Sequence, residues 1–390
     1  MIIVFKQHAK ESDIQDICSK IEKLGYEPRV IKGVERTVIG AVGDEQMHKS
    51  LEVFKTFDCV EDVLPIQKRY KIASREYHKE SSIVKIGKKK IGKGHFQVIA
   101  GPCAIESYAQ LKKTTEDIIK AGAGIIRGGA YKPRTSPYDF QGLGEEGLEL
   151  LQRIKEEYKV PVVTEVVGVT HIDKVAKVAD CLQIGARNSQ NYHLLEAVAS
   201  AGRPVLLKRG MSSTIEEWLS AAEYLIVNGC HDVILCERGI RTFEHATRNT
   251  LDLSAVAIAK RETHLPVIVD PSHAAGRYDL VLPLSKAAIA IGADGLIVEA
   301  HCDPVNAVSD AAQQIPSADF GRFMKELEPI MKAGNMAIEE WIARQTGPRG
   351  KGLTKKSSSR LPSSTFSGKN REASGRELRT TSTISDAWTG

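Results

Sequence analysis

The sequence predicts an α/β protein, a closed (β/α)8 TIM barrel with an N-terminal ferredoxin-like βαββαβ domain and a disordered C-terminal tail. Short apolar runs alternate with longer amphipathic stretches over residues 96–346, which is typical of parallel strands and covering helices. The first 72 residues show a different order of strands and helices, and the last 44 are poor in apolar side chains. The composition, 42% hydrophobic and 26% charged, is that of an ordinary globular protein with a large core.

Residues 1–72 are predicted to form a small independent domain with two helices and four strands. Apolar residues recur at helical spacing in two places, and β-rich runs flank each of them. The βαββαβ order is the ferredoxin-like arrangement. Residues 73–95 are polar and rich in Lys and Gly, and we expect a linker that ends in a short hairpin. The expected elements are strand 2–5, a helix on Ile14, Ile17, Ile21 and Leu24, strands 27–31 and 36–42, a helix on Met47, Leu51 and Phe54, and strand 59–67.

Residues 96–346 are predicted to form the barrel. Their β-runs are continuously apolar rather than alternating, as expected for parallel strands that are buried on both faces. The 251 residues agree with the length of about 250 that such barrels need. An open doubly wound sheet is the alternative, but no glycine fingerprint for a dinucleotide follows the first run. The eight runs are 96–100, 124–127, 161–165, 181–184, 205–208, 232–236, 267–269 and 295–298.

The net charge of +5 belongs to the tail rather than to the folded part. Residues 347–390 hold nine Lys and Arg against three Asp and Glu, which leaves a net charge of −1 for residues 1–346. We therefore expect no nucleic-acid partner. The tail's composition predicts disorder, either as a tether or phosphorylation region or as an extension without a role.

Other sequence features predict a cytoplasmic protein without a membrane partner. No apolar run reaches the ~18 residues of a membrane-spanning helix, and the first residues lack the features of a signal peptide. The seven cysteines are scattered, unlike those of a secreted disulfide framework. A reducing compartment is therefore expected.

Basic side chains follow several of the predicted strands. The active site of such a barrel lies at the C-terminal ends of its strands, so these side chains should converge there. A single cation on a loop is usually solvated, but several at one barrel mouth would repel one another without anionic ligands. Arg and Lys bind phosphate and carboxylate groups, which predicts a phosphorylated or carboxylated metabolite as the ligand. The six cations are Arg127, Lys132, Arg134, Arg187, Lys208 and Arg238.

A second set of residues at the strand ends offers ligands for a metal ion. Cys103, His273, Glu299 and Asp310 supply sulfur, nitrogen and oxygen atoms near the barrel axis. A mixed set of this kind suits a divalent ion of intermediate softness, such as Mn, Fe, Zn or Co, and leaves its identity open. Taken singly, the cysteine could be a core residue and the aspartate a cap. The residues that compete as ligands or as second-layer partners are Glu106, Glu165, His301 and Asp303.

Four motifs together resemble the 3-deoxy-7-phosphoheptulonate (DAHP) synthase family. The 1–72 domain resembles the regulatory domain of the short microbial branch of this family, so that the resemblance covers residues 1–346. The motifs are Gly101-Pro102-Cys103 with Glu106-Ser107, Lys132-Pro133-Arg134-Thr135-Ser136, Ile184-Gly185-Ala186-Arg187 and Asp270-Pro271-Ser272-His273.

The resemblance implies a metal-dependent aldol-type transferase that condenses phosphoenolpyruvate with erythrose 4-phosphate, the first step of the shikimate pathway to aromatic amino acids. It implies that Cys103, His273, Glu299 and Asp310 bind the metal. Lys132, Cys103 and His273 are the implied catalytic residues, with Lys132 a candidate proton donor. The implied substrate ligands are Arg127, Lys132, Arg187, Lys208 and Arg238 for phosphoenolpyruvate, and Lys132, Pro133, Arg134, Thr135 and Ser136 for the sugar phosphate.

The sequence leaves two alternatives to this function open. One is 3-deoxy-octulosonate 8-phosphate synthase, which uses arabinose 5-phosphate; its second-strand loop reads Lys-Ala-Asn-Arg-Ser, unlike residues 132–136 here. The other is a non-catalytic metabolite sensor built on the same barrel. The resemblance further implies a homo-oligomer, commonly a tetramer, and feedback inhibition by tyrosine or phenylalanine bound to residues 1–72.

Overall fold

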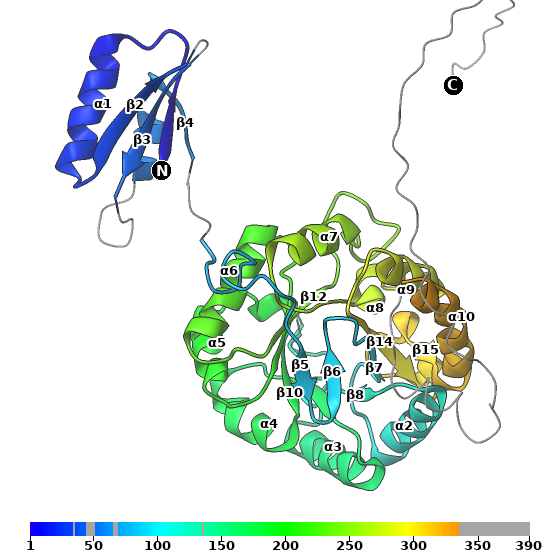
Figure 1. Ribbon diagram of the computed structural model, residues 1–390. Helices are drawn as coiled ribbons and strands as arrows, with labels where there is room; N and C mark the ends of the chain where they lie inside the picture. Colours follow the sequence, from blue (N-terminus) through cyan, green and yellow to red (C-terminus); the bar gives the residue numbers. More distant parts are fainter. Residues whose placement is uncertain (34–35, 44–50, 65–68, 135, 335–390) are drawn as a thin grey trace, which may run out of the picture. The chain divides into compact units, whose positions relative to one another are not determined.

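The computed structural model describes residues 1–33, 36–43, 51–64, 69–134 and 136–334. Its described part contains a small α/β domain and a complete parallel barrel (Figure 1). The predicted tail 347–390, Met47 and Thr135 lie outside the described residues. No helix among the described residues is long and apolar enough to span a bilayer.

The N-terminal domain is an antiparallel sheet with the strand order β2-β3-β1-β4, as the ferredoxin-like prediction requires. Ile14, Ile17 and Ile21 of the first helix are buried in the core of this domain, which confirms the helix predicted from their spacing. The described part of the second predicted helix is a 3-10 helix, η1, rather than an α-helix. The elements are β1 (Ile2–Phe5), α1 (Glu11–Lys23), β2 (Glu27–Lys32), β3 (Thr37–Val42), η1 (Leu51–Thr56) and β4 (Val60–Leu64).

Eight parallel strands close the barrel, because the last one, β14 (Gly295–His301), pairs with both β13 (Val267–Val269) and β7 (Gln97–Gly101). All eight predicted runs are strands, and three have the predicted bounds. The remaining strands are β8 (Ile125–Arg127), β9 (Val162–Glu165), β10 (Cys181–Ile184), β11 (Val205–Lys208) and β12 (Val233–Glu237), and a short β15 (Ile315–Pro316) pairs with the end of β14.

Helices surround the barrel in the ring visible in Figure 1. A shorter helix, α8 (Pro271–Ala275), starts directly after β13 and carries one of the predicted ligands. The others are α2 (Tyr108–Ala121), α3 (Glu145–Tyr158), α4 (Ile172–Val178), α5 (Tyr192–Ala199), α6 (Ile215–Val227), α7 (Leu253–Glu262), α9 (Val281–Ala290) and α10 (Phe320–Ala333).

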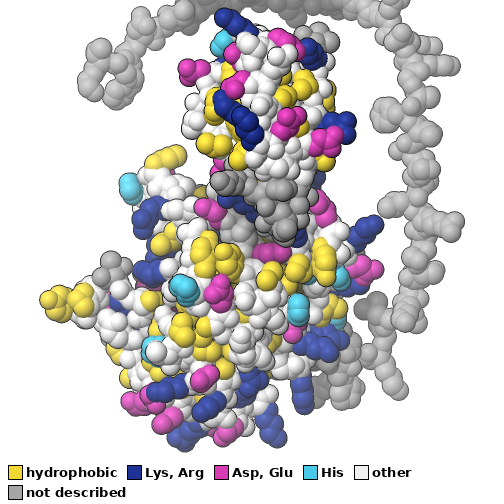
Figure 2. Space-filling view, turned by 90° about the vertical axis from the view of Figure 1, so that its left-hand side faces the viewer, with side chains coloured by type: hydrophobic (Ala, Val, Ile, Leu, Met, Phe, Trp, Pro, Cys, Tyr) yellow, Lys and Arg dark blue, Asp and Glu magenta, His cyan; other side chains and the backbone are white. Residues whose placement is uncertain are grey.

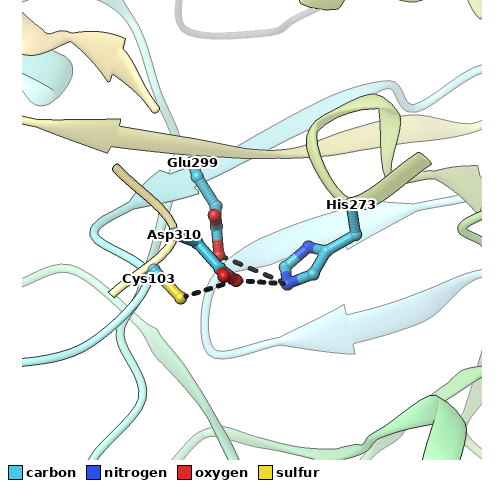
Figure 3. Close-up of side chains that lie close together, drawn as sticks. All are labelled: Cys103, His273, Glu299 and Asp310. Atoms are coloured by element: carbon cyan, nitrogen blue, oxygen red, sulfur yellow. Dashed lines mark hydrogen bonds and ion pairs between the residues drawn. The ribbon is translucent and has the colours of Figure 1, made fainter. Parts of the chain in front are cut away.

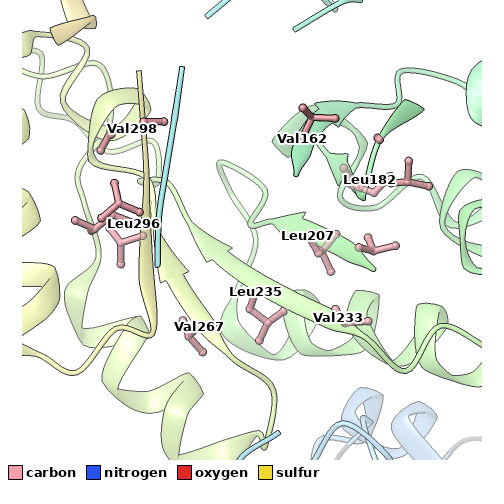
Figure 4. Close-up of a cluster of buried hydrophobic side chains, with 14 of the residues drawn as sticks. Val162, Leu182, Leu207, Val233, Leu235, Val267, Leu296 and Val298 are labelled. Carbon is pink, nitrogen blue, oxygen red and sulfur yellow. The ribbon is translucent and has the colours of Figure 1, made fainter. Parts of the chain in front are cut away.

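The barrel strands are apolar on both faces because two separate layers are packed there. Leu207 and Leu235 belong to the outer layer between strands and helices, part of which is drawn in Figure 4. Leu206 and Ile234, their chain neighbours, belong to the inner layer inside the barrel. Successive strand residues point to opposite faces, so two apolar layers produce the continuous runs seen in the sequence.

A hairpin of β5 (Val84–Ile86) and β6 (Lys89–Ile91) packs into the N-terminal end of the barrel. Val84, Ile86 and Ile91 belong to the inner layer and are almost completely buried. The chain before it is also docked: the backbone amides of Ile72 and Ala73 donate to the carboxylate of Glu223, each at 2.8 Å. The segment predicted as a linker is therefore part of the barrel's packing, with a polar outer side.

The face in Figure 2 carries acidic and basic side chains next to one another, with hydrophobic side chains between them. The mixture agrees with the near-zero charge of residues 1–346.

Candidate active site

The carboxyl ends of the barrel strands bring the four predicted metal ligands together (Figure 3). One ligand atom each from Cys103, His273, Glu299 and Asp310 lies within 4.8 Å of the others. Cys103 follows β7, Glu299 lies in β14, and His273 lies in α8, where the Asp270 side chain accepts from the His273 amide at 2.9 Å. Asp310 arrives on the loop after β14, in a left-handed conformation with φ 51°, which is uncommon for a residue with a side chain.

The geometry of this cluster, which we call the four-ligand cluster, directs donor atoms towards one point. Cys103 Sγ lies 3.4 Å from Asp310 Oδ2. His273 Nε2 lies 3.4 Å from Glu299 Oε1 and 3.9 Å from Asp310 Oδ2. His273 Nδ1 lies 2.8 Å from Asp270 Oδ2, which leaves Nε2 to face the cluster. A carboxylate behind the ring is the usual support of a metal-binding histidine, so the donor set fits a divalent ion.

Side chains behind the cluster hold two of its members. Gln313 Nε2 donates to Glu299 Oε2 at 2.7 Å, and Gln314 Oε1 accepts from the Cys103 amide at 3.0 Å. These glutamines come from the same loop as Asp310. The loop therefore fixes three ligands at once.

The protonation states in the cluster follow from burial and nearby charge. Burial, with a smaller contribution from Glu299, raises the pKa of the Cys103 thiol to about 12. Burial alone would raise the pKa of Glu299, but His273 and Arg127 hold it far below its usual range. Burial lowers the pKa of His273, and Asp270 only partly opposes this. A neutral imidazole and an ionised carboxylate are ready to bind a metal ion, whereas the thiol must lose its proton on binding.

A cation-lined pocket of about 70 Å³ adjoins the four-ligand cluster. Five of the six predicted cations line it, together with His273 and Asp310 of the cluster. Arg127 lies outside the lining and instead forms a buried ion pair with Glu299. Its Nε has no hydrogen-bond partner among the described residues. The lining residues are Lys132, Pro133, Arg134, Glu165, Gln183, Gly185, Ala186, Arg187, Lys208, Arg238, Arg248, His273 and Asp310.

Lys132 connects the pocket with the four-ligand cluster. Its Nζ donates to the carbonyl oxygen and to Sγ of Cys103, each at 3.1 Å. The side chain is 9% exposed and forms no ion pair with a described carboxylate. Lys132 is thus a charged donor beside the metal ligands, at the wall of the pocket.

The other cations differ in how far they are already paired. Lys208 Nζ contacts Asp270 Oδ2 at 2.6 Å. Arg134 donates to the carbonyl of Phe140 at 2.9 Å and to the Ser309 hydroxyl, and no described carboxylate pairs with it. Arg238 is 5% exposed, and its side-chain contacts among the described residues are two long ones, at 3.4 Å, to main-chain carbonyls. Burial lowers the pKa of Arg238, as expected for a guanidinium without a direct counter-ion.

The competing ligands lie outside the four-ligand cluster. Glu106 Oε1 is 3.3 Å from His301 Nε2, so these two pair with each other. The Asp303 carboxylate accepts from the side-chain Nδ2 of Asn306 at 2.7 Å. Glu165 lines the pocket and accepts from Gln183 at 3.1 Å. Of the sugar-phosphate segment, Pro133 lines the pocket, whereas the Ser136 hydroxyl accepts from the Tyr138 amide at 3.3 Å.

One pocket cation was not identified from the sequence. Arg248 lines the pocket and lies 3.2 Å from Asp310 Oδ2, and it donates to Gln313 Oε1 at 3.1 Å. It stands eleven residues beyond the end of β12, within a polar loop. The site residues were predicted from the side chains that directly follow each strand, and Arg248 lies too far from the end of β12 to be found in this way.

Comparisons with known proteins show which family the chain resembles. Residues 71–371 match the DAHP synthetase I family, and residues 1–68 match the DAHP synthase ferredoxin-like domain. Phospho-2-dehydro-3-deoxyheptonate aldolase of Thermotoga maritima is 50% identical over 333 residues, which cover 85% of this chain and 98% of that protein. A 2-dehydro-3-deoxyphosphooctonate aldolase of Acidithiobacillus ferrooxidans is 32% identical over 260 residues, covering 61% of this chain and 91% of that protein.

Solved structures extend the similarity to three dimensions. The crystal structure of the Thermotoga maritima DAHP synthase superposes with a TM-score of 0.81 at 49% identity, covering 86% of this chain and 98% of that one. A truncated form of the Thermotoga maritima enzyme superposes with a TM-score of 0.65 at 48% identity, covering 69% of this chain and 98% of that one. Both parts of the described fold have counterparts in the family, and the matched profile spans most of the sequence. The chain therefore belongs to the DAHP synthetase I family and carries that family's ferredoxin-like domain at its N-terminus.

Proposed function

We propose that this chain condenses phosphoenolpyruvate with erythrose 4-phosphate to give 3-deoxy-D-arabino-heptulosonate 7-phosphate and inorganic phosphate. The observation that carries the proposal is the shared wall of the four-ligand cluster and the cation-lined pocket. His273 and Asp310 belong to both, and Lys132 touches both. The family membership and the relative at 50% identity support the same reaction.

The charges of the pocket suit two phosphorylated substrates. Phosphoenolpyruvate carries a carboxylate and a phosphate, and Arg187, Lys208 and Arg238 would bind these groups. Arg134 would take the phosphate of the sugar, because its guanidinium has no described acidic partner. Lys208 is now paired with Asp270, so it would share its charge between this carboxylate and the ligand.

The four-ligand cluster would hold the metal ion. A divalent ion bound there supplies Lewis-acid polarisation of the aldehyde oxygen. His273 is set for this role by its contact with Asp270, and Glu299 is kept ionised by Arg127 and His273. Cys103 would lose its proton on metal binding, and the adjacent ammonium of Lys132 stabilises the resulting thiolate.

The chain's own groups account for the steps of the condensation. The pocket holds carbon 3 of phosphoenolpyruvate against the aldehyde carbon, and this orientation supplies much of the acceleration. As the new carbon–carbon bond forms, Lys132 Nζ donates a proton to the aldehyde oxygen. Water adds to carbon 2, which has become electron-poor, and one of its protons returns to the Lys132 amine. The bond between carbon 2 and the phosphate oxygen then breaks, the remaining hydroxyl proton passes to the departing phosphate as the ketone forms, and Arg187 and Arg238 stabilise that phosphate.

The rival substrate is arabinose 5-phosphate. One observation favours it: relatives that are 32% identical carry the name 2-dehydro-3-deoxyphosphooctonate aldolase. The sequence of residues 132–136 and the 50% identical relative favour the four-carbon sugar. The test is phosphate release by the purified chain with phosphoenolpyruvate and either sugar. Turnover with arabinose 5-phosphate alone selects the rival, and no turnover with either sugar under any divalent metal selects a sensor.

We further propose a regulatory role for residues 1–72 and a place at the entry to the shikimate pathway. The barrel residues named above contain the whole site, so the N-terminal domain is not needed for the chemistry. Tyrosine or phenylalanine would bind to this domain as a feedback effector, in a cytoplasmic homotetramer. An effector acts only if it binds one conformation better than another.

Deletion of residues 1–68, the part that matches the ferredoxin-like domain, tests this regulatory role and leaves the docked Ile72 in place. We expect the truncated enzyme to remain active and to ignore millimolar tyrosine and phenylalanine, while the full chain responds to one of them. A full chain that ignores both amino acids would contradict the feedback role. Molecular mass in solution tests the tetramer.

A further inference from the structure

A second cavity, of about 510 Å³, lies at the N-terminal end of the barrel. The turn of the β5–β6 hairpin, the C-terminal ends of α2 and α3, and the residues before β8, β9 and β10 line it. Since the strands are parallel, this cavity and the active site are at opposite ends of the barrel. We propose that the cavity binds a small organic carboxylate with an apolar body. The argument for this cavity does not use the reaction at the active site, although the binding test below uses the proposed substrate to fill the other pocket.

The cavity wall contains the side-chain amide of Gln97. Gln97, the first residue of β7, is 5% exposed, and its side chain has no hydrogen-bond partner among the described residues. Its amide atoms are not among the fully buried polar atoms without a partner, so they remain accessible from the cavity that they line. Gly124 lies against this amide: a Cβ atom at this position would be 2.4 Å from Gln97 Oε1. The absence of a side chain at Gly124 therefore leaves the amide open to the cavity.

The lining of the cavity carries more basic than acidic side chains. Four lysines line the cavity, Lys88, Lys89, Lys155 and Lys159, against a single carboxylate, Asp180. Asp180 is already used: it accepts from Lys155 Nζ at 2.9 Å and from the Val162 amide at 3.0 Å.

Two of these lysines are available to a ligand. Lys88 and Lys159 are exposed and form no ion pair or side-chain hydrogen bond among the described residues. The C-terminal end of a helix carries a partial negative charge of about half a unit, so α2 and α3 disfavour an anion in the cavity. The full positive charges of Lys88 and Lys159 outweigh these two partial charges. The lining therefore favours an anion.

The remaining lining defines the body of the ligand. Ile119, Ala123, Val160 and Pro161 contribute an apolar wall to the lining. A bare inorganic ion would leave this wall in contact with water. A carboxylate on an aromatic or short aliphatic body would satisfy the lysines, cover the wall and place a carboxylate oxygen or a hydroxyl near the amide of Gln97.

Benzoate is a suitable probe, and benzamide is its neutral counterpart. Binding to the full chain is measured by saturation-transfer NMR and calorimetry with saturating phosphoenolpyruvate, which occupies the pocket of the other end. We expect a benzoate site that phosphoenolpyruvate does not displace and that benzamide fills at least tenfold more weakly. The double variant Lys88→Gln/Lys159→Gln should weaken benzoate binding at least tenfold. Gly124→Ala should weaken it too, because the new methyl group displaces the Gln97 amide.

Lys85→Gln is the matched control, because Lys85 is an exposed lysine of the same hairpin that does not line the cavity. It should bind benzoate like the parent chain. All variants change exposed side chains or a flexible contact, so circular dichroism should show the parent fold. The proposal is overturned if no benzoate site survives phosphoenolpyruvate, if benzamide binds equally well, or if Lys85→Gln weakens binding as much as the double variant.

Discussion

Arg209 donates from Nη1 to Glu237 Oε2 at 2.9 Å, and the chain neighbours of this pair, Lys208 and Arg238, both line the active-site pocket. Arg209 also donates to Asp252 Oδ2 at 3.0 Å and to the carbonyl of Ser213 at 3.0 Å. Glu237 Oε1 in turn accepts from the Gly239 amide at 2.7 Å. This buried network connects the loops after β11 and β12 behind the pocket, so it supports the two cations in front of it.

Replacement of Arg209 by methionine should strongly destabilise the barrel. The change leaves Glu237, which is 0% exposed, without its charged partner. Breaking a buried ion pair in this way costs about 3–5 kcal/mol. Urea unfolding measures the loss. Arg277→Met is the control, because its pair with Asp279 is exposed and should be worth ~0–1 kcal/mol. Equal stabilities of the two variants would contradict the role of the network.

The same network predicts a pH dependence of stability. Burial raises the pKa of the Glu237 carboxyl, although Arg209 acts in the opposite direction. A group with a raised folded-state pKa stabilises the fold below its unfolded value of about 4.3 and loses that contribution as pH rises through the folded-state pKa. We expect the unfolding free energy of the parent chain, minus that of Glu237→Gln, to fall from pH 4.3 towards neutrality. Urea titrations at several pH values measure this difference; a difference that rises with pH would contradict the environment described for Glu237.

Replacement of Cys103 by alanine should abolish both metal binding and turnover. The sulfur is one of four converging ligand atoms, and its loss leaves three. Metal content by mass spectrometry and phosphate release are the measurements. Cys181→Ala is the control, because Cys181 is equally buried inside the barrel but outside the cluster. Full activity of Cys103→Ala, or of the parent chain in a strong chelator, would refute the metal site.

Replacement of Arg134 by alanine should mainly raise the KM for erythrose 4-phosphate, by tenfold or more, because a charged contact to the sugar phosphate is lost. The KM for phosphoenolpyruvate should change much less. Ser309→Ala removes the hydroxyl that Arg134 contacts while leaving the guanidinium in place, and it should retain most of the affinity for the sugar. If Ser309→Ala raises this KM as much as Arg134→Ala does, Arg134 acts by holding the loop rather than by binding phosphate.

The fold and the ligand set could be predicted because both follow local rules. Strands buried on two faces give continuous apolar runs, and side chains directly after parallel strands must meet at one end of the barrel. The position of Cys103, His273 and Glu299 at the ends of parallel strands therefore predicted that they lie together, as they do. The pairing of Arg127 with Glu299, across 172 positions of the sequence, could not be predicted, because a strand-end residue has several neighbours of opposite charge.

Two other features were beyond sequence reasoning. Arg248 enters the pocket from a long loop, whose path depends on packing against the neighbouring loops. The segment before the hairpin has a polar composition, which concealed that the amides of Ile72 and Ala73 are bound by Glu223. In each case the partner is distant in sequence.

The most direct test of the proposed function is phosphate release by the purified full-length chain with phosphoenolpyruvate and erythrose 4-phosphate, before and after removal of divalent metal. We predict metal-dependent release of one phosphate per sugar consumed, with loss of activity in chelator and recovery on addition of a divalent transition metal. We also predict much slower release with arabinose 5-phosphate. Equal turnover of the metal-free chain, or turnover with arabinose 5-phosphate alone, would contradict the proposed function.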